Sequence, residues 1–236
     1  KRRVFQLNEA LKISPKKLDS NFHFEVISNI AGRYRIATLS NDDFLFECGQ
    51  YLNLVSLAGK EIPLSIASSP LDLPKLKVIY RPEFSNPDSL LLEKMLDQQT
   101  VDASSSLGSV RYPLDDKNLV LICKGTGISQ AASMTEHCKL LSSPRKILLI
   151  WNTDDSLEDQ LKDSPETWFP SIDQIVSNHQ GLQNYLETQR TTLNNAHCII
   201  TGDPEFVYTV HDTLLKHGFS TASIQSDVFD YAPRCL

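Results

Sequence analysis

The chain lacks the features that mark a membrane-spanning protein or a nucleic-acid-binding protein. No apolar run in its 236 residues approaches the roughly 18 that a membrane span requires, and no secretory signal peptide is recognisable. There is no basic excess either, since 23 Lys and Arg against 29 Asp and Glu give a formal net charge of −6. That sign argues against nucleic acid or an anionic membrane as a partner.

Cysteine and histidine are present without the spacing of a metal site. The five cysteines include no C-x-x-C pair, and the six histidines lie far apart, so we expect no metal. Cys48, Cys123 and Cys198 lie in apolar, strand-like segments, where a buried and reduced thiol is expected. Reduced cysteines predict a cytoplasmic location.

Length and composition are those of an ordinary globular protein. The chain is 41% apolar and 22% charged, with 9 Gly and 12 Pro. This length suffices for one large domain or two small ones, each with its own core. The sequence begins with Lys1 rather than Met, which leaves open whether an upstream segment was removed.

The first half of the chain has the pattern of an antiparallel barrel. Residues 1–20 are basic and mixed, and we expect a solvated extension whose role stays open. From 21 to 115, short segments alternate apolar and polar residues between turn-forming clusters, which predicts a six-stranded Greek-key barrel domain. Expected strands include 22–27, 33–39, 51–57, 76–81 and 100–103. Asp88 is a candidate N-cap for one helix that ends near residue 96.

After Pro113 the pattern changes to strands that alternate with helices. This predicts an α/β domain over 116–236, built as a doubly wound parallel sheet of five strands. Expected strands are 118–123, 146–151, 172–177, 197–201 and 222–225. Expected helices are 129–141, 157–163, 181–190 and 204–217.

A Gly-Thr-Gly turn follows the first of these strands. The apolar run before Gly125 predicts a buried parallel strand, and a helix-compatible segment follows Gly127. Such a helix points unsatisfied N–H groups at the space above the turn, an arrangement that suits a phosphate or pyrophosphate. The full G-x-G-x-x-G fingerprint is absent because Gln130 stands at the third glycine position, and an ordinary strand-to-helix turn explains the residues equally well.

Five segments in a fixed order resemble the ferredoxin–NADP reductase superfamily. Upstream of the Gly-Thr-Gly turn they are Gly49-Gln50-Tyr51 and Pro63-Leu64-Ser65-Ile66, and downstream of it the first is Lys146-Ile147-Leu148-Leu149-Ile150-Trp151-Asn152. Thr201-Gly202-Asp203-Pro204 and Asp227-Val228-Phe229-Asp230-Tyr231 follow. The chain is most similar to the NAD(P)H:flavin oxidoreductase branch of that superfamily, which includes the flavin reductases associated with luciferase. The resemblance extends over residues 22 to 233.

The resemblance implies a flavin site on the barrel domain. Ser65 would lie near flavin N5 and orient it, a positioning role in catalysis. The implied flavin-binding residues are Pro63, Leu64, Ser65, Ile66, Tyr80, Arg81, Ser85, Phe229 and Tyr231. The family motif is Arg, any residue, Tyr or Phe, then Ser, whereas this chain has Ile62 in place of the arginine and Leu64 in place of the aromatic residue. Loss of that cation implies a weakly held FMN or FAD, with Arg81 a candidate substitute and a surface arginine the alternative.

The resemblance also implies a nicotinamide-nucleotide site on the α/β domain. Its residues would be Gly125, Thr126, Gly127, Ile128, Trp151, Asn152, Asp154, Gly202, Asp203 and Pro204. Asp203 is equally well explained as a helix N-cap. Asp154 and Asp155 stand where relatives often carry an arginine or serine that meets the 2′-phosphate of NADP. Carboxylates repel that phosphate and accept from a ribose hydroxyl, so NADH is expected over NADPH; a solvated loop is the alternative.

These residues together predict an oxidoreductase that transfers a hydride from NADH to FMN, FAD or riboflavin between the two domains. Two alternatives remain open. One is a reductase with bound flavin that passes electrons to an iron–sulfur protein. The other is a degenerate family member that acts as a binding module, because Ile62, Leu64, Gln130 and Asn152 depart from the active pattern. The electron acceptor and the oligomeric state are not determined by the sequence.

Overall fold

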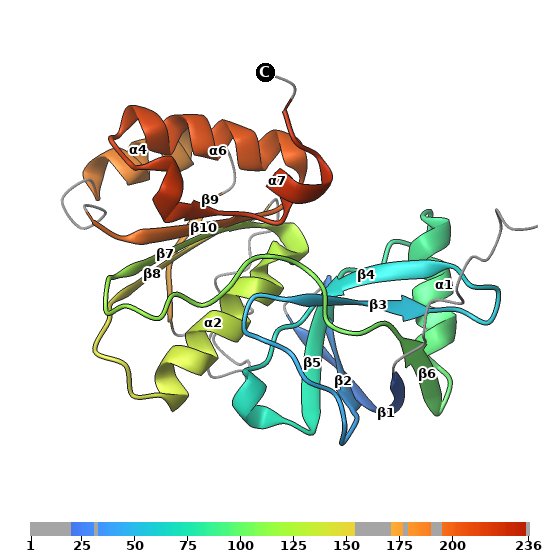
Figure 1. The fold of residues 1–236 in the computed structure, drawn as a ribbon. Coiled ribbons are helices and arrows are strands. Elements are labelled where there is room, and N and C mark those ends of the chain that lie inside the picture. Colours follow the sequence, from blue (N-terminus) through green and yellow to red (C-terminus); the bar gives the residue numbers. More distant parts are fainter. Residues whose placement is uncertain (1–19, 31–32, 154–170, 177–178, 190–194, 235–236) are drawn as a thin grey trace, which may run out of the picture.

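The protein is described here by a computed structural model, which covers residues 20–30, 33–153, 171–176, 179–189 and 195–234. The structure contains two sheets that lie side by side (Figure 1). The first half of the chain forms an antiparallel sheet, and the second half forms a parallel sheet. Four of the five cysteines fall within the described residues, and all four are buried and free. Within the same residues, no helix combines the length and the apolar character needed to cross a membrane.

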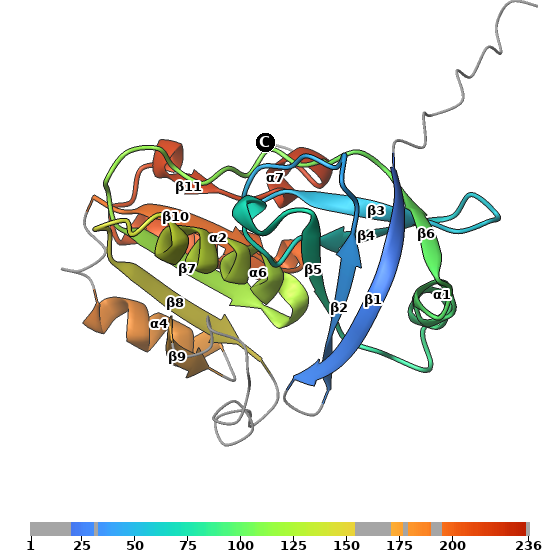
Figure 2. The same ribbon diagram turned by 90° about the horizontal axis from the view of Figure 1, so that it is seen from below.

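The antiparallel sheet has six strands in the order β4-β3-β6-β1-β2-β5. Their bounds are β1 Ser20–Ile30, β2 Tyr34–Ser40, β3 Tyr51–Val55, β4 Glu61–Ser65, β5 Lys75–Tyr80 and β6 Thr100–Ala103. The sheet curls so that the two outer strands approach each other, and Ala67 N donates to Lys77 O at 2.7 Å just beyond β4 (Figure 2). Period-two alternation turns one face of each strand toward a common apolar core.

One helix, α1 (Pro87–Leu96), packs against this barrel through Leu92, Met95 and Leu96. Its N-cap is Asn86, whose side chain accepts from Asp88 N at 2.9 Å, so the expectation that Asp88 caps the helix is wrong. The helix begins at Pro87 because the first helical residue needs no N–H donor, which proline lacks. The preceding residue, Asn86, is therefore the N-cap.

The parallel sheet has five strands in the order β11-β10-β7-β8-β9. Their bounds are β7 Leu119–Lys124, β8 Ile147–Asn152, β9 Ile172–Val176, β10 His197–Thr201 and β11 Ile224–Gln225. The helices are α2 Ile128–Leu140, α4 His179–Thr188, α6 Pro204–Lys216 and the short α7 Val228–Tyr231, and the 3₁₀ turns include η1 Pro70–Asp72, η2 Gly125–Gly127 and η4 Thr221–Ser223. Helix α2 covers the face toward the barrel, whereas α4 and α6 cover the opposite face (Figure 1).

Helix α2 joins the two halves. Small side chains along it allow close approach, and Ser133 Oγ donates to Ser68 O at 2.7 Å while Ser129 Oγ donates to Ile79 O at 3.2 Å. One apolar core contains Tyr34 and Ile79 of the barrel together with α2 and the parallel strands. The carboxyl ends of β7 and β10 are therefore held against the barrel by buried packing.

The predicted fold class, an antiparallel barrel-like sheet followed by a doubly wound parallel sheet, is confirmed. The boundary at residue 115 lies between the last strand of one sheet and the first of the other, and the division into domains 21–115 and 116–236 stays a prediction. Residues Val228–Tyr231, which carry the predicted flavin contacts Phe229 and Tyr231, form the short helix α7. The helix expected over 157–163 lies outside the described residues.

Candidate functional site

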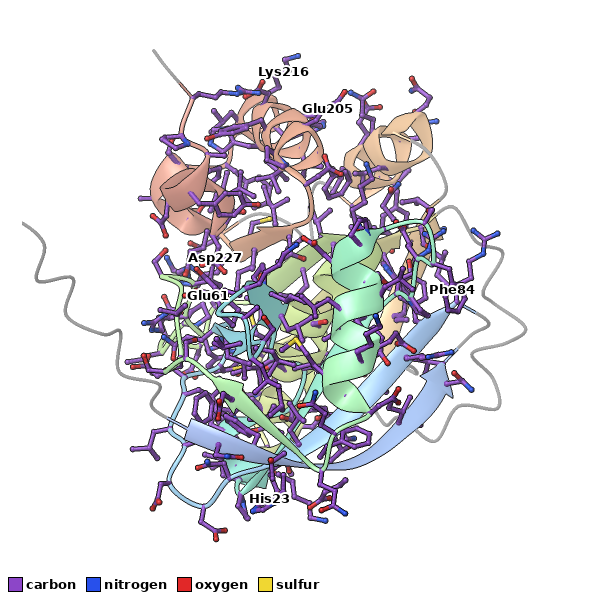
Figure 3. All side chains as sticks on the ribbon, turned by 90° about the vertical axis from the view of Figure 1, so that its right-hand side faces the viewer. His23, Glu61, Phe84, Glu205, Lys216 and Asp227 are labelled. Atoms are coloured by element: carbon purple, nitrogen blue, oxygen red, sulfur yellow. The ribbon has the colours of Figure 1, made fainter. Side chains whose placement is uncertain are left out.

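A cavity of about 970 Å³ lies between the two sheets, at the upper end of the size range of small-molecule sites. Both halves of the chain line it, among them Glu61 of the barrel and Asp227 of the C-terminal segment, which are labelled near each other in Figure 3. Twelve predicted site residues meet here: Pro63, Leu64, Ser65, Tyr80, Arg81, Gly125, Thr126, Gly127, Asn152, Gly202, Asp203 and Tyr231. What each of them binds stays a prediction.

The barrel wall of the cavity is the hairpin of β3 and β4. Register pairs Tyr51 with Ser65 and Asn53 with Pro63, and these side chains share the face that lines the cavity. Asn53 Nδ2 donates to Glu61 Oε2 at 2.6 Å on the same face. The wall therefore presents an aromatic ring, a hydroxyl, a proline ring and a hydrogen-bonded carboxylate.

Ile62 points the other way, into the barrel core, with 8% of its surface exposed. The sequence interpretation treated this position as one that lost a phosphate-binding cation. In the structure the residue does not line the cavity, because strand alternation turns Ile62 inward and Pro63 outward. Leu64 is also largely buried but contributes to the cavity lining.

The end of β5 supplies Tyr80 and Arg81. Burial, together with the neighbouring Glu93, raises the pKa of Tyr80, which keeps its phenol neutral. Glu93 is held in turn by an ion pair with Arg35 of β2. Arg81 Nε lies 4.0 Å from Glu83 Oε1, so a carboxylate stands close to this guanidinium.

The Gly-Thr-Gly turn forms η2 at the end of β7. Gly125 has φ +55°, and a Cβ there would meet only open space, so the backbone conformation is what favours glycine. Trp151 Nε1 donates to Gly125 O at 3.0 Å, and Thr201 Oγ1 donates to Gly127 O at 2.8 Å. A Cβ on Gly127 would lie 2.7 Å from Thr201 Oγ1, so this glycine permits close approach of the second turn.

That second turn, Gly202-Asp203, follows β10 and begins α6. Asp203 Oδ1 accepts from Phe206 N at 2.9 Å, which confirms the N-cap alternative. Its other oxygen, Oδ2, lies 2.8 Å from Lys124 Nζ. Burial raises the pKa of Asp203, but its hydrogen bonds to Lys124 and Phe206 lower it by more, so the carboxylate stays ionised.

The C-terminal segment closes the cavity on a third side. Asp227 Oδ2 accepts from Gln130 Nε2 at 2.6 Å, and Oδ1 accepts from Ser109 N at 3.0 Å and from Val110 N at 3.3 Å. Burial raises the pKa of Asp227 above its ordinary value despite these bonds. Tyr231, two-thirds exposed, extends from the same segment and lines the cavity.

Six predicted residues do not line the cavity. Ile66 and Ile128 are buried in the apolar cores. Trp151 is also buried, and it supports the glycine turn through its hydrogen bond to Gly125 O. Phe229 packs on Tyr208, with ring centroids 5.7 Å apart. The remaining two, Ser85 and Pro204, lie beside residues that do line it, namely Asn86 and Asp203. Asp154 and Asp155 lie outside the described residues.

Sequence reasoning missed several residues that line the cavity. The most informative are Tyr51, Asn53, Glu61, Lys124 and Asp227. Alternation along the hairpin would have identified Tyr51 and Asn53, since they pair with the predicted residues Ser65 and Pro63. Lys124 directly precedes the Gly-Thr-Gly turn and Asp227 begins the last segment that carries the resemblance, but nothing local distinguishes either residue.

Sequence comparison with known proteins finds only distant similarity for this chain. No family model matches the chain. A probable flavin reductase from Aliivibrio fischeri is 25% identical over 130 residues, which cover 52% of the chain and 54% of that protein. The match therefore spans about half the length of this relative.

Solved structures give a longer match at lower identity. Phthalate dioxygenase reductase has a TM-score of 0.70 and 17% identity, over 88% of this chain and 67% of that chain. A ferredoxin–NADP⁺ reductase from Neisseria gonorrhoeae has a TM-score of 0.67 and 20% identity, over 88% of this chain and 97% of that chain. The fold that the resemblance predicted is thus confirmed: the chain has the ferredoxin–NADP reductase-like fold.

Proposed function

We propose that the protein is an NADH-dependent flavin reductase, in which a hydride passes from NADH to a flavin inside the cavity between the sheets. One observation carries the proposal: a single cavity is lined by Pro63 and Ser65 of β4 on one side and by both glycine turns on the other. Two ligands that must exchange a hydride need such a shared space. The A. fischeri relative, named a probable flavin reductase, supports the same activity.

The barrel wall fits a flavin. Pro63 and Tyr231 expose ring surfaces to the cavity, which suits a flat aromatic ligand. Asn53, Glu61 and Asn86 add polar groups that can bond to a polyol chain. Ser65 lines the same cavity from the face of β4 that also carries Pro63, and its hydroxyl can donate to a ring nitrogen.

The opposite wall fits a nicotinamide nucleotide. Both glycine turns bring backbone to the cavity without a side chain, and each stands at the beginning of a 13-residue helix. The helix dipoles favour a negatively charged group at this position. We propose that Gly125, Thr126, Gly127 and Gly202 hold the dinucleotide.

The hydride chemistry is supplied by the two bound cofactors. The chain's own residues orient them: Ser65 fixes the flavin ring, and the close approach of Gly127 to Thr201 fixes the turns that hold the nucleotide. Gln130 and Asp227 hold the C-terminal segment, and with it Tyr231, at the edge of the cavity. No side-chain nucleophile is needed.

We propose NADH rather than NADPH, because Asp154 and Asp155 follow β8 and would repel a 2′-phosphate. The last two described residues before them, Asn152 and Thr153, are neutral and line the cavity. We propose further that FMN and FAD are weakly held substrates. In the described part of the barrel wall Arg81 is the one cation, and it lies near Glu83.

A second candidate is a reductase that passes electrons to an iron–sulfur protein. The fold neighbour phthalate dioxygenase reductase transfers electrons to a [2Fe–2S] centre. Phe84, exposed next to the cavity-lining Glu83, supplies an apolar contact for such a partner. Free buried cysteines agree with a cytoplasmic location for either activity.

The test is an absorption spectrum of the purified protein, followed by an assay of NADH oxidation with and without added flavin. We expect a colourless protein that oxidises NADH only when flavin is added. A tightly bound flavin would favour the electron-transfer candidate. A protein with neither property would be a degenerate binding module, and the proposal would be wrong.

A further inference from the structure

Lys124 is the last residue of β7 and lines the cavity next to the first glycine turn. Its ammonium lies 2.8 Å from Asp203 Oδ2 and 5.8 Å from the centre of the Phe206 ring. The side chain therefore crosses from one glycine turn to the other. Of the described residues that line the cavity, only Arg81 and Lys124 are cationic, and only Lys124 belongs to the nucleotide wall.

The position of Lys124 depends on Gly202. A Cβ on Gly202 would lie 3.0 Å from Lys124 Cβ and 3.0 Å from Phe206 Cδ1. Glycine at this point leaves room for the lysine stem to lie over the turn. As a result, the ammonium stands at the beginning of α6, where the helix dipole already favours an anion.

Both carboxylate oxygens of Asp203 already have a partner in the protein, since Oδ1 caps α6 and Oδ2 holds Lys124. Besides its predicted direct contact with the nucleotide, Asp203 can therefore act through Lys124. Both partners of the ion pair are more than two-fifths exposed, at 42% and 46%. An ion pair this exposed is weak, so an incoming anion can take over the ammonium at little cost.

We propose that Lys124 is the phosphate-recognising residue of the nucleotide site. Asp203 holds the ammonium in the protein without ligand, and the pyrophosphate of the dinucleotide replaces Asp203 as its partner. This inference rests on the proposed function, since it assumes that a nicotinamide nucleotide enters the cavity. It adds a consequence: the site selects its reductant by the phosphate groups as well as by the nicotinamide.

The test is a fluorescence titration of NADH binding in the absence of flavin. Lys124→Met keeps the apolar stem over Phe206 and removes the charge, and we expect the Kd for NADH to rise roughly tenfold. Reduced nicotinamide riboside, which has no phosphate, should bind wild type and variant equally. Lys117→Met is the matched control, because Lys117 precedes the opposite end of β7, carries the same charge and does not line the cavity.

Asp203→Asn provides a second variant with the opposite expectation. Asparagine is as good an N-cap as aspartate, so α6 keeps its beginning while Lys124 loses its carboxylate partner. We expect NADH to bind more tightly, and the gain to disappear in Lys124→Met/Asp203→Asn. Thermal unfolding of each variant reports whether the fold is intact.

The outcomes separate this inference from the proposed function. Equal NADH affinity in wild type and Lys124→Met would overturn the inference, while flavin-dependent NADH oxidation would still stand. A matching loss of affinity for the phosphate-free riboside would also overturn it, since a general packing role would then explain the loss. A wild-type protein that binds no NADH would overturn both.

Discussion

The side-chain amide of Gln130 lies between two acceptors from distant parts of the chain. Its Nε2 donates to Asp227 Oδ2 at 2.6 Å and to Gly49 O at 2.6 Å. One buried amide thus joins α2, the barrel and the C-terminal segment. The position that the sequence presents as a missing third glycine is instead a cross-link between the parts that form the cavity.

This arrangement predicts that Gln130→Leu is destabilising. The variant removes the donor to Asp227 Oδ2 and leaves the buried carbonyl of Gly49 without this donor, which costs about 1–3 kcal/mol. Urea unfolding measures the change in the free energy of unfolding. The control is Gln180→Leu, which removes an exposed amide that bonds to Asn184 on α4 and should change little. Equal effects of the two substitutions would contradict the cross-link.

Asp227 predicts an unusual dependence of stability on pH. Burial raises its pKa in the folded protein above the ordinary value, so between these two pKa values the folded state holds a proton that the unfolded state has released. Its contribution to stability is therefore greatest at low pH and is lost as the pH rises through the raised pKa. Asp227→Asn removes this titration, so its free energy of unfolding relative to wild type should rise with pH across that window.

Asp115 gives the opposite sign and serves as the comparison. A hydrogen bond from His197, at 2.8 Å, lowers the pKa of Asp115. Its contribution is present above the ordinary pKa and is lost as the pH falls through the lowered value. Asp115→Asn should therefore be less stable than wild type at higher pH, and the difference should shrink in acid. Parallel pH profiles for the two variants would contradict this account.

The sequence predicts the fold well because its signals are local. The change from period-two to alternating strand and helix patterns near Pro113, and the two glycine turns, each depend on a few consecutive residues. The face of β4 is harder to predict. Ile62-Pro63-Leu64 is apolar throughout, so alternation does not reveal that Ile62 faces the core and Pro63 the cavity.

Contacts between distant residues account for the rest of what the sequence does not reveal. Lys124 meets Asp203, and Gln130 meets Asp227 across 97 positions. Trp151 and Ile128 are predicted nucleotide contacts, yet both side chains are fully buried and neither lines the cavity. Distinguishing a residue that lines the cavity from one that supports it requires the packing of α2 against the barrel.

Ser65→Ala tests the positioning role of this hydroxyl. Because orientation of the flavin ring matters most during hydride transfer, we expect kcat to fall by roughly tenfold while KM for flavin changes little. Ser105→Ala is the control, since Ser105 is exposed, lies on the same half of the chain and does not line the cavity. A rise in KM at unchanged kcat would mean that Ser65 contributes only to flavin binding.

Nucleotide preference tests the carboxylates that follow β8. We expect kcat/KM for NADH to exceed that for NADPH, because a 2′-phosphate would approach Asp154 and Asp155. Replacing both with Ser should narrow the difference and leave kcat/KM for NADH within a few-fold of wild type. If wild type uses NADPH as well as NADH, the argument from these carboxylates is wrong.

The last prediction concerns binding of the flavin phosphate. Two neighbouring residues are compared: Ile62, which lies in the barrel core, and Glu61, which lines the cavity. The sequence alone predicts that Ile62→Arg restores a phosphate site and tightens FMN. In the structure Ile62 is packed in the barrel core, so an arginine there buries an unpaired charge and should cost about 3–5 kcal/mol of stability instead. Its neighbour Glu61 lines the cavity beside Asn53.

Glu61→Gln removes one negative charge from the cavity wall and keeps an oxygen that accepts from Asn53. We therefore expect FMN to bind more tightly while riboflavin affinity stays nearly constant, because only FMN carries a phosphate to repel. Quenching of flavin fluorescence measures both affinities. Tighter FMN in a stable Ile62→Arg protein, with no change in Glu61→Gln, would mean that β4 presents its other face to the flavin.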